Sequence, residues 1–319
     1  MTRATILGVP HEYSLTPPTS AGAVLVFIHG WLLSRGYWSP LVQQLASQCQ
    51  CLTYDLRGFG HSQGDLQQHC SHIPAVAGEL GASTSPFSLA AYAGDLGTLL
   101  ATLGLNKVWL VGHSLGGSIA LWTALCYPER VRGVICLNAG GGIYLKQEFE
   151  RFRQAGRQIV GFRPAWLRYF PFLGWPFTRL MVARPLDYRW GWQRLLDLLQ
   201  ADEAAALGAL LESTTEAEVH RLPQVVASLR QPAYFMAGAA DRVMAPRYVH
   251  HLASFHHLFD SVDSNVIELP RCGHMAMVEC PEQVAEHIQA LLVRHQQLVN
   301  SGVDSQEILH QSPNTSKNG

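Results

Sequence analysis

The sequence has no long hydrophobic run, no signal-peptide pattern and no excess of charge of one sign. No apolar run approaches the roughly 18 residues that a membrane-spanning helix needs, and residues 1–10 lack the basic and apolar regions of a secretory signal. We therefore expect a cytoplasmic protein. Lys and Arg number 23 and Asp and Glu number 24, which gives a net charge of −1. No overall basic field exists to attract nucleic acid, so we expect no nucleic-acid partner.

Cysteine patterns typical of disulfide frameworks and metal sites are also missing. The seven cysteines form no C-x-x-C pair, and their odd number argues against a secreted, disulfide-bonded domain. Cys49 and Cys51 are two residues apart, so a strand would place both side chains on one face, which favours core packing. We also predict no metal site at the four histidines on a helix-like run, which lack carboxylates at ligand spacing: His250, His251, His256 and His257.

The composition and the hydrophobic pattern predict an α/β fold. With 319 residues, 48% of them apolar and 15% charged, the chain can form one large domain or two unequal ones. Short apolar runs alternate with longer helical patterns, which is typical of a doubly wound, mostly parallel sheet covered by helices on both faces. The predicted parallel strands are residues 23–28, 51–54, 108–111, 134–137, 233–237 and 266–269, with an antiparallel edge at 6–14. The predicted helices are residues 41–47, 89–103, 118–127 and 281–295.

Three segments depart from this alternation. Residues 64–86 are polar and longer than most connections between a strand and a helix. Residues 142–223 contain no strand-like pattern, and about a quarter of residues 142–192 are aromatic, against 9% in the whole chain. We predict that 142–223 form a helical cap, or lid, inserted into a core made of 1–141 and 224–299. The polar residues 300–319 are predicted to be a disordered tail.

The strongest chemical signal is the segment 112–117, Gly-His-Ser-Leu-Gly-Gly, directly after a predicted strand. A serine on a tight strand-to-helix turn needs small residues two positions to either side, because larger side chains would collide with the flanking backbone. Such a turn exposes the Ser114 hydroxyl at the carboxyl end of the sheet. It also points the positive end of the next helix at negative charge that develops there. We predict that Ser114 is a nucleophile; the alternative is a turn without a catalytic role.

A serine hydroxyl needs a base near neutral pH, and the base needs a carboxylate to hold its tautomer. Among 15 histidines, His274 lies between the last predicted strand and the last predicted helix, at the same sheet edge as Ser114. Asp241 follows the strand 233–237 and reaches that edge too. Asn138, at the comparable position after the preceding strand, cannot supply the charge. We predict a triad of Ser114, His274 and Asp241; a packing histidine and a turn-forming aspartate are the alternatives.

Other polar residues near these motifs are predicted to be structural or to act through the backbone. We interpret His113, Asp55 and Asp95 as structural, and an Asp–Arg pair would brace the loop 54–58 that contains Asp55. The substrate oxygen needs preorganised donors. The backbone N–H groups of Leu115 and Trp31 are predicted to supply an oxyanion hole, because the turn at residues 29–31 follows the first long strand. Trp31 as a plain core aromatic is the alternative.

Five motifs in this order resemble the α/β-hydrolase superfamily. They are His-Gly-Trp at 29–31, Tyr-Asp-Leu-Arg-Gly-Phe-Gly-His-Ser at 54–62, and the segments 112–117, 238–241 and 273–274. The segment 29–62 is most similar to the esterase and cofactor-free haloperoxidase branch. The resemblance covers about residues 20–140 and 230–295 and implies a doubly wound sheet and a Ser-His-Asp triad without a cofactor. Ser114 stands where dehalogenases and epoxide hydrolases carry Asp, which argues against those reactions.

The predicted cap is basic as well as aromatic. Residues 142–200 carry a net charge of +6, so the rest of the chain carries −7. Arginine-bearing aromatic segments can lie at a membrane surface and bind anionic headgroups, which makes the cap a candidate for peripheral membrane contact. A cap whose aromatics fill its own interface with the sheet is the alternative. The sequence leaves the oligomeric state open.

These observations predict a serine hydrolase of carboxylic esters, with a small-molecule and lipophilic substrate. Three other reactions would use the same residues: thioester hydrolysis, carbon–carbon bond hydrolysis, or peracid formation as in the haloperoxidase-like branch. A third class also stays open, namely a ligand-binding or peripheral membrane protein that kept the pocket without turnover.

Overall fold

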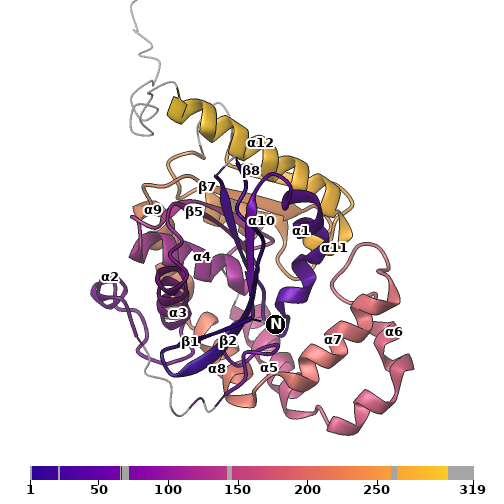
Figure 1. The fold of residues 1–319 in the computed structure, drawn as a ribbon. Helices are drawn as coiled ribbons and strands as arrows, with labels where there is room; N and C mark the ends of the chain where they lie inside the picture. The colour runs from indigo at the N-terminus through magenta and orange to yellow at the C-terminus, as the bar shows by residue number, and fades with distance from the viewer. Residues whose placement is uncertain are drawn as a thin grey trace, which may run out of the picture.

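The computed structural model describes residues 2–20, 22–64, 66, 72–141, 146–259 and 264–300. An eight-stranded sheet forms the centre of the molecule, in the order β1-β2-β4-β3-β5-β6-β7-β8 (Figure 1). The strands β3 to β8 pair in parallel, and β1 and β2 add an antiparallel edge. The strands are β1 (Thr2–Ile6), β2 (Val9–Leu15), β3 (Val24–Ile28), β4 (Gln50–Tyr54), β5 (Val108–His113), β6 (Val131–Leu137), β7 (Ala233–Gly238) and β8 (Val266–Leu269).

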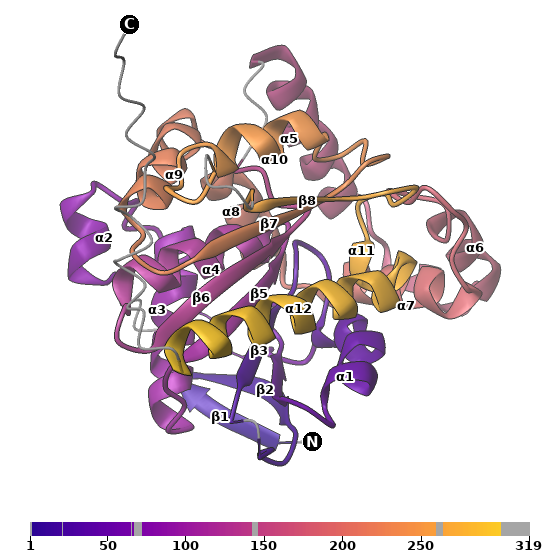
Figure 2. The ribbon, with the colours of Figure 1, turned by 90° about the horizontal axis from the view of Figure 1, so that it is seen from above.

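Helices cover both faces of this sheet, as the continuous apolar strands predict. One face carries α1 (Ser39–Leu45), α11 (Ala276–Glu279) and α12 (Pro281–Asn300). The other carries α2 (Ala75–Glu79), α3 (Leu89–Thr102), α4 (Leu115–Cys126), α9 (Glu216–Ser228) and α10 (Pro246–Ala253), as Figures 1 and 2 show. Alternate strand residues enter two separate cores: Val26 packs towards α3 and α4, and Phe27 towards α1. The doubly wound α/β fold is confirmed.

The six predicted parallel strands are all present, whereas the predicted edge 6–14 is a hairpin of two strands, β1 and β2, which turns at Leu7 and Gly8 with positive φ angles. The starts of β6 and α4 also differ from the prediction. Strand β6 begins at Val131, earlier than the predicted 134, because Val131 and Gly133 pair with Val108 and Trp109 of β5. The prediction started too late because Arg132 and Gly133 interrupt the apolar run. A Cβ atom on Gly133 would lie 2.3 Å from the Trp109 ring, so this glycine leaves room for the indole. Helix α4 begins at Leu115 rather than at 118, since the glycine pair that is unfavourable for helix propensity is required by close packing.

Helix α3 is capped at both ends, and the two cysteines predicted to be in the core are buried. The Ser88 hydroxyl accepts a hydrogen bond from the Ala91 N–H at 3.1 Å and caps α3. Gly104, just beyond the end of that helix, has a φ of +67°. Cys49 and Cys51 are both buried in the core under α1 and α12. No helix in the described ranges is both long and apolar enough to cross a bilayer.

Helices and 3₁₀ turns connect β6 to β7, and we use the name cap only as a label for residues 146–223 of this connection. The helices are α5 (Lys146–Gly161), α6 (Gly174–Phe177), α7 (Tyr188–Gln200), α8 (Glu203–Ser213) and α9, with 3₁₀ turns at Ala165–Tyr169 and Pro171–Leu173. Both views place α6 and α7 in a lobe at the margin of the molecule, beside the sheet (Figures 1 and 2). The predicted cap boundary at 223 falls inside α9, whose Leu222 and Val226 join the sheet core. Of the predicted tail 300–319, only Asn300 lies within the described residues.

Candidate functional site

Ser114 occupies a strained turn between β5 and α4. Its φ and ψ angles are 52° and −119°, a region that residues with a side chain rarely adopt. The Ser114 N–H donates to the Leu137 carbonyl at 2.9 Å, which fixes the turn to the neighbouring strand. A Cβ atom on Gly112 would lie 2.3 Å from the Gly116 carbonyl oxygen, and one on Gly116 would lie 2.2 Å from that of Ile28. The glycines are therefore required by steric contact, as the sequence pattern predicts.

His274 and Asp241 are joined by a hydrogen bond. The His274 Nδ1 lies 2.7 Å from Asp241 Oδ2, and both residues are buried. The other oxygen of Asp241 accepts the N–H groups of Val243 and Met244 at 2.8 and 2.9 Å. Burial acts to raise the pKa of Asp241, but the His274 ring and these N–H groups outweigh it and lower the pKa below its usual value. A carboxylate held in this way stays ionised and keeps the His274 proton on Nδ1.

Asn138 also holds the Asp241 carboxylate. Its side-chain amide donates to Asp241 Oδ2 at 2.9 Å and to the Gly273 carbonyl oxygen at 3.1 Å. Asn138 is fully buried and has a φ of +50°, which asparagine tolerates better than most residues. Asn138, which cannot supply a charge itself, therefore positions Asp241, which does. Sequence reasoning used Asn138 only by exclusion and missed this contact.

His113 connects the Ser114 turn to the His274 loop. Its Nε2 lies 2.7 Å from the His274 carbonyl oxygen, so Nε2 carries the proton and donates it. Burial lowers the pKa of His113 to about 3, so the ring is neutral at physiological pH. Among the described residues no hydrogen bond joins the Ser114 hydroxyl to the His274 ring. In enzymes without substrate such bonds are commonly long and shorten when substrate binds.

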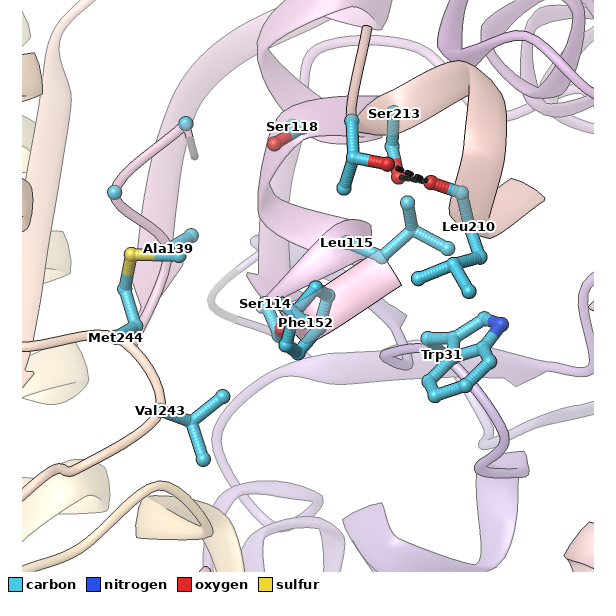
Figure 3. Close-up of a pocket in the computed structure, with 13 residues that line it drawn as sticks. Trp31, Ser114, Leu115, Ser118, Ala139, Phe152, Leu210, Ser213, Val243 and Met244 are labelled. Atoms are coloured by element: carbon cyan, nitrogen blue, oxygen red, sulfur yellow. Dashed lines mark hydrogen bonds between the residues drawn. The ribbon is translucent and has the colours of Figure 1, made fainter. Parts of the chain in front are cut away.

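A pocket of about 680 Å³, counting space open to solvent, lies over Ser114. Figure 3 shows Ser114 between Trp31 and Leu210 on one side and Val243 and Met244 on the other. Only a minority of the residues that line the pocket carry polar side chains. The residues lining the pocket are Trp31, Ser114, Leu115, Ser118, Ala139, Gly140, Gly141, Phe152, Leu210, Ser213, Thr214, Val243 and Met244. The size and the apolar lining are those of a small-molecule site.

The two predicted backbone donors lie at this pocket. Leu115 is the first residue of α4, where helix N–H groups have no partner within the helix. Trp31 follows β3, and its indole N–H donates to the Ala206 carbonyl oxygen at 2.8 Å, which anchors the side chain to α8. The preceding His29 accepts the Leu56 N–H at Nε2 (2.9 Å), so its Nδ1 donates to the Gly30 carbonyl oxygen at 2.8 Å. These bonds fix the backbone of the Trp31 turn.

The His274 loop is held by the cap as well as by the core. The His274 N–H donates to the Met181 carbonyl oxygen at 2.8 Å. The Glu279 carboxylate accepts the N–H groups of Gly273 and Met275, each at 3.0 Å, and that of Ala183 in the cap at 2.8 Å. Glu279 therefore clamps both sides of the loop. The motif at 273–274 gave no indication of these contacts.

Asp55 and Asp95 both form ion pairs that hold loops together, but the partner of Asp55 is not the arginine of its own loop. Asp55 pairs with Arg35 (2.5 Å) rather than with Arg57 of its own loop. Arg57 instead forms a buried pair with Asp95 on α3 at 2.9 Å. The loop 54–58 is therefore braced by two Asp–Arg pairs that each reach another segment, because neighbouring side chains on a tight loop point apart.

The histidines of the helix-like run do not gather. His250 contacts Glu268 of β8 at 2.8 Å, and the ring centroids of the neighbours His256 and His257 are 4.1 Å apart with the planes tilted by 34°. Within the described ranges, no three His, Cys, Asp or Glu side chains come together in a group that could hold a metal ion.

Several pocket residues were missed by sequence reasoning. Ser118 lies four residues after Ser114 on α4, so helical spacing could have found it. Val243 and Met244 follow Asp241 on its own loop and were equally accessible. Phe152 of α5 and Leu210 of α8 come from the cap, where no spacing rule connects them to the sheet.

A strand-to-helix serine turn at the carboxyl edge of a doubly wound sheet, beside a buried His–Asp pair, defines the class of the α/β hydrolases. The model of the alpha/beta hydrolase fold family matches residues 23–281. The chain belongs to this family.

The relatives are hydrolases of several kinds. A pimeloyl-[acyl-carrier protein] methyl ester esterase of Stenotrophomonas maltophilia is 27% identical over 85% of this chain and 93% of its own. A putative carbamate hydrolase of Enterobacter cloacae is 28% identical over 61% of this chain and 63% of its own. Among solved structures, a Thermogutta terrifontis esterase superposes with a TM-score of 0.68 and 22% identity, over 92% of this chain and 99% of its own. These comparisons support an esterase-like hydrolase.

Proposed function

We propose that the protein is a serine hydrolase that cleaves carboxylic esters with lipophilic acyl groups. The observation that carries the proposal is the buried hydrogen bond between His274 and Asp241, on loops tied by His113 to the turn of Ser114. Nucleophile, base and carboxylate are the residue types that acyl transfer needs. The apolar pocket above Ser114 supports an acyl chain as substrate.

The chemistry follows from these positions. The Ser114 hydroxyl attacks the ester carbonyl and gives its proton to His274 Nε2, and Asp241 stabilises the imidazolium that forms. Negative charge on the carbonyl oxygen is met by the N–H groups of Trp31 and Leu115 and by the positive end of α4. His274 then protonates the leaving alcohol, and water activated by His274 hydrolyses the acyl-enzyme. Apart from the substrate and water, each step uses groups of this chain.

The relatives point to the kind of ester. One is a pimeloyl-[acyl-carrier protein] methyl ester esterase, whose substrate by that name is a methyl ester with an acyl group on a carrier protein. A pocket lined by Phe152, Leu210 and Met244 suits such an acyl group. Thioester, carbon–carbon and peracid chemistry would use the same triad, and a substrate panel separates them.

The first experiment measures hydrolysis of p-nitrophenyl esters of graded chain length by the wild type and by Ser114→Ala. The variant should lose roughly 10³-fold or more in kcat/KM, because no other group supplies the nucleophile. The matched control is Ser118→Ala, which removes a second pocket hydroxyl and should retain activity within about threefold. A fluorophosphonate probe should label Ser114, and mass spectrometry of the peptide checks this. Equal activity of the wild type and Ser114→Ala would contradict the proposed nucleophile. Binding of vesicles or ligands without labelling of Ser114 would favour a non-catalytic binding protein.

A further inference from the structure

Large apolar side chains are exposed in one stretch of the cap. Among the described residues, ten of the thirteen exposed large apolar side chains lie between Ile159 and Tyr188. Seven of them are aromatic, and we call the six that lie between residues 162 and 175 the aromatic stretch: Phe162, Trp166, Tyr169, Phe170, Phe172 and Trp175. Phe162 is 81% exposed, Tyr169 69% and Phe172 65%, so these rings do not fill the interface between cap and sheet. The alternative of an inward-packed cap therefore does not account for them.

The rings contact one another on the outside of the molecule. The ring centroids of Trp166 and Phe170 are 5.6 Å apart and those of Phe170 and Phe172 are 5.7 Å apart, both edge to face. The lobe that contains α6 stands at the margin of the molecule in both views (Figures 1 and 2). Exposed apolar clusters of this kind mark surfaces that contact another apolar phase or partner.

The charge of the same stretch has one sign. Residues 162–186 contain four arginines and no aspartate or glutamate. Two of these arginines are exposed and lie against exposed rings: Arg168 over Tyr169 at 5.2 Å and Arg179 over Trp175 at 5.1 Å. Guanidinium groups held at the rim of an aromatic cluster can bind phosphates while the rings enter an apolar layer.

We propose that the aromatic stretch with Arg168 and Arg179 docks the protein on the surface of an anionic lipid bilayer. Tryptophan, tyrosine and phenylalanine enter the headgroup–acyl boundary, and the arginines bind lipid phosphates. A symmetric second copy fits less well, because a two-fold interface would set this basic surface against itself. An acidic protein would satisfy the arginines but not several separately protruding rings. The proposal concerns binding and stands whether or not the chain hydrolyses esters.

Docking would place the pocket near the membrane. The roof of the pocket, Phe152 of α5 and Leu210 of α8, belongs to the same cap as the aromatic stretch. Docking through the aromatic stretch would therefore bring the cap that carries this part of the pocket lining to the membrane surface.

The experiment is flotation of the full-length protein with vesicles of phosphatidylcholine alone or with about 30% phosphatidylglycerol. The wild type should float with the anionic vesicles, and binding should weaken on raising salt from ~0.1 to ~0.5 M. Phe162→Ser/Phe172→Ser/Trp175→Ser should lose at least tenfold in affinity, since each ring removes apolar area from the bilayer. Arg168→Gln/Arg179→Gln should lose about fivefold for each charge on anionic vesicles only.

The control is Val76→Ser/Phe255→Ser/Val293→Ser, which removes the three large apolar side chains that are exposed outside the cap in the part of the chain that the structure describes. It should bind as the wild type does, and all variants should keep the wild-type Tm and hydrolysis of a short soluble ester. Bilayers with brominated acyl chains should quench Trp166 and Trp175 fluorescence, which reports insertion directly. Absence of vesicle binding by the wild type, or equal loss in the control, overturns the proposal. A dimer that the aromatic variant dissociates, without vesicle binding, assigns the surface to a second copy.

Discussion

The backbone N–H of His274 donates to the carbonyl oxygen of Met181, so the cap and the loop of the proposed general base share a hydrogen bond of 2.8 Å. Two residues further on, the Ala183 N–H binds Glu279, which also accepts the N–H groups of Gly273 and Met275. The position of the imidazole therefore depends on a segment more than 90 residues earlier in the chain. At residues 181–183 the cap is therefore bonded directly to the core.

The first prediction concerns Glu279. Glu279→Gln replaces a carboxylate that accepts three N–H groups with an amide that can accept fewer and brings N–H groups of its own. We expect kcat to fall about tenfold with little change in KM, because the imidazole is displaced and the pocket is not. The control is Glu282→Gln, an exposed glutamate in the first turn of α12. Steady-state kinetics with a Tm for each variant provide the test; equal kcat for both variants contradicts a positioning role.

The second prediction concerns Asn138. In Asn138→Asp a second carboxylate would lie about 2.9 Å from Asp241, and two carboxylates at that distance cannot both stay ionised. The shared proton weakens the partner of His274, and we expect a loss of about 10-fold to 100-fold in kcat at neutral pH. Asn138→Asp/Asp241→Asn moves the charge to the end of β6 and should recover part of the activity that Asp241→Asn loses. If the kcat of the double variant is no higher than that of Asp241→Asn alone, a carboxylate at residue 138 cannot replace Asp241 as the partner of His274.

The third prediction is a pH dependence of stability at the cap. Asp197 of α7 is buried, and its carboxylate accepts hydrogen bonds from Ser34 at 3.1 Å and Gln193 at 2.8 Å. Burial raises the pKa of Asp197 from 3.8 to about 7, although these hydrogen bonds act in the opposite direction. The folded state therefore binds a proton that the unfolded state has lost between about pH 4 and 7, and the free energy of unfolding should fall as the pH rises through that range.

Asp197→Asn should remove this pH dependence and stabilise the protein above pH 7, on the order of 1–3 kcal/mol. Urea unfolding at several pH values measures it. Asp187→Asn, an exposed residue at the start of the same helix, is the control and should keep the wild-type slope. The contradicting result is a free energy of unfolding that changes by the same amount from pH 4 to pH 7 in the wild type and in both variants. Asp197 would then be ionised in the folded protein over this range.

The fourth prediction concerns substrate length. Phe152 of α5 lines the pocket (Figure 3), and its removal would leave space for additional methylene groups. Phe152→Ala should shift the preferred acyl chain to longer esters, by about 0.8 kcal/mol of kcat/KM discrimination for each methylene that gains burial. The control is Phe162→Ala, in the same cap and 81% exposed, which should leave the chain-length profile unchanged. An identical shift in both variants would place the acyl chain outside this pocket.

The architecture was predictable because it depends on local patterns. Buried parallel strands read as continuous apolar runs, and the strand ends agreed within a few residues even where Gly133 interrupts β6. Gly112 and Gly116 are predictable for a steric reason, since a Cβ atom at either would collide with backbone. Asp241 and His274 followed from their places after β7 and β8, and the structure brings these two together.

The contacts that complete the site were not predictable in the same way. Asn138, Glu279 and Met181 act through hydrogen bonds between segments far apart in the chain, and no periodicity encodes such pairs. The predicted partner of Asp55 was wrong for a related reason: Arg57 lies only two residues away in the sequence, but the turn of the chain directs its side chain to Asp95. Phe152 and Leu210 reach the pocket only through the packing of the cap.

The bond between Met181 and His274 limits how this part of the molecule can move. A displacement of residues 181–183 away from the core would break the hydrogen bond to His274, whose ring is bonded to Asp241, so we expect substrate to enter without movement of this segment. Redesign of substrate range should accordingly work on Phe152 and Leu210 and leave the backbone of 181–183 untouched. At residues 181–183, a change that alters entry of substrate to the pocket would also alter the position of the His274 imidazole.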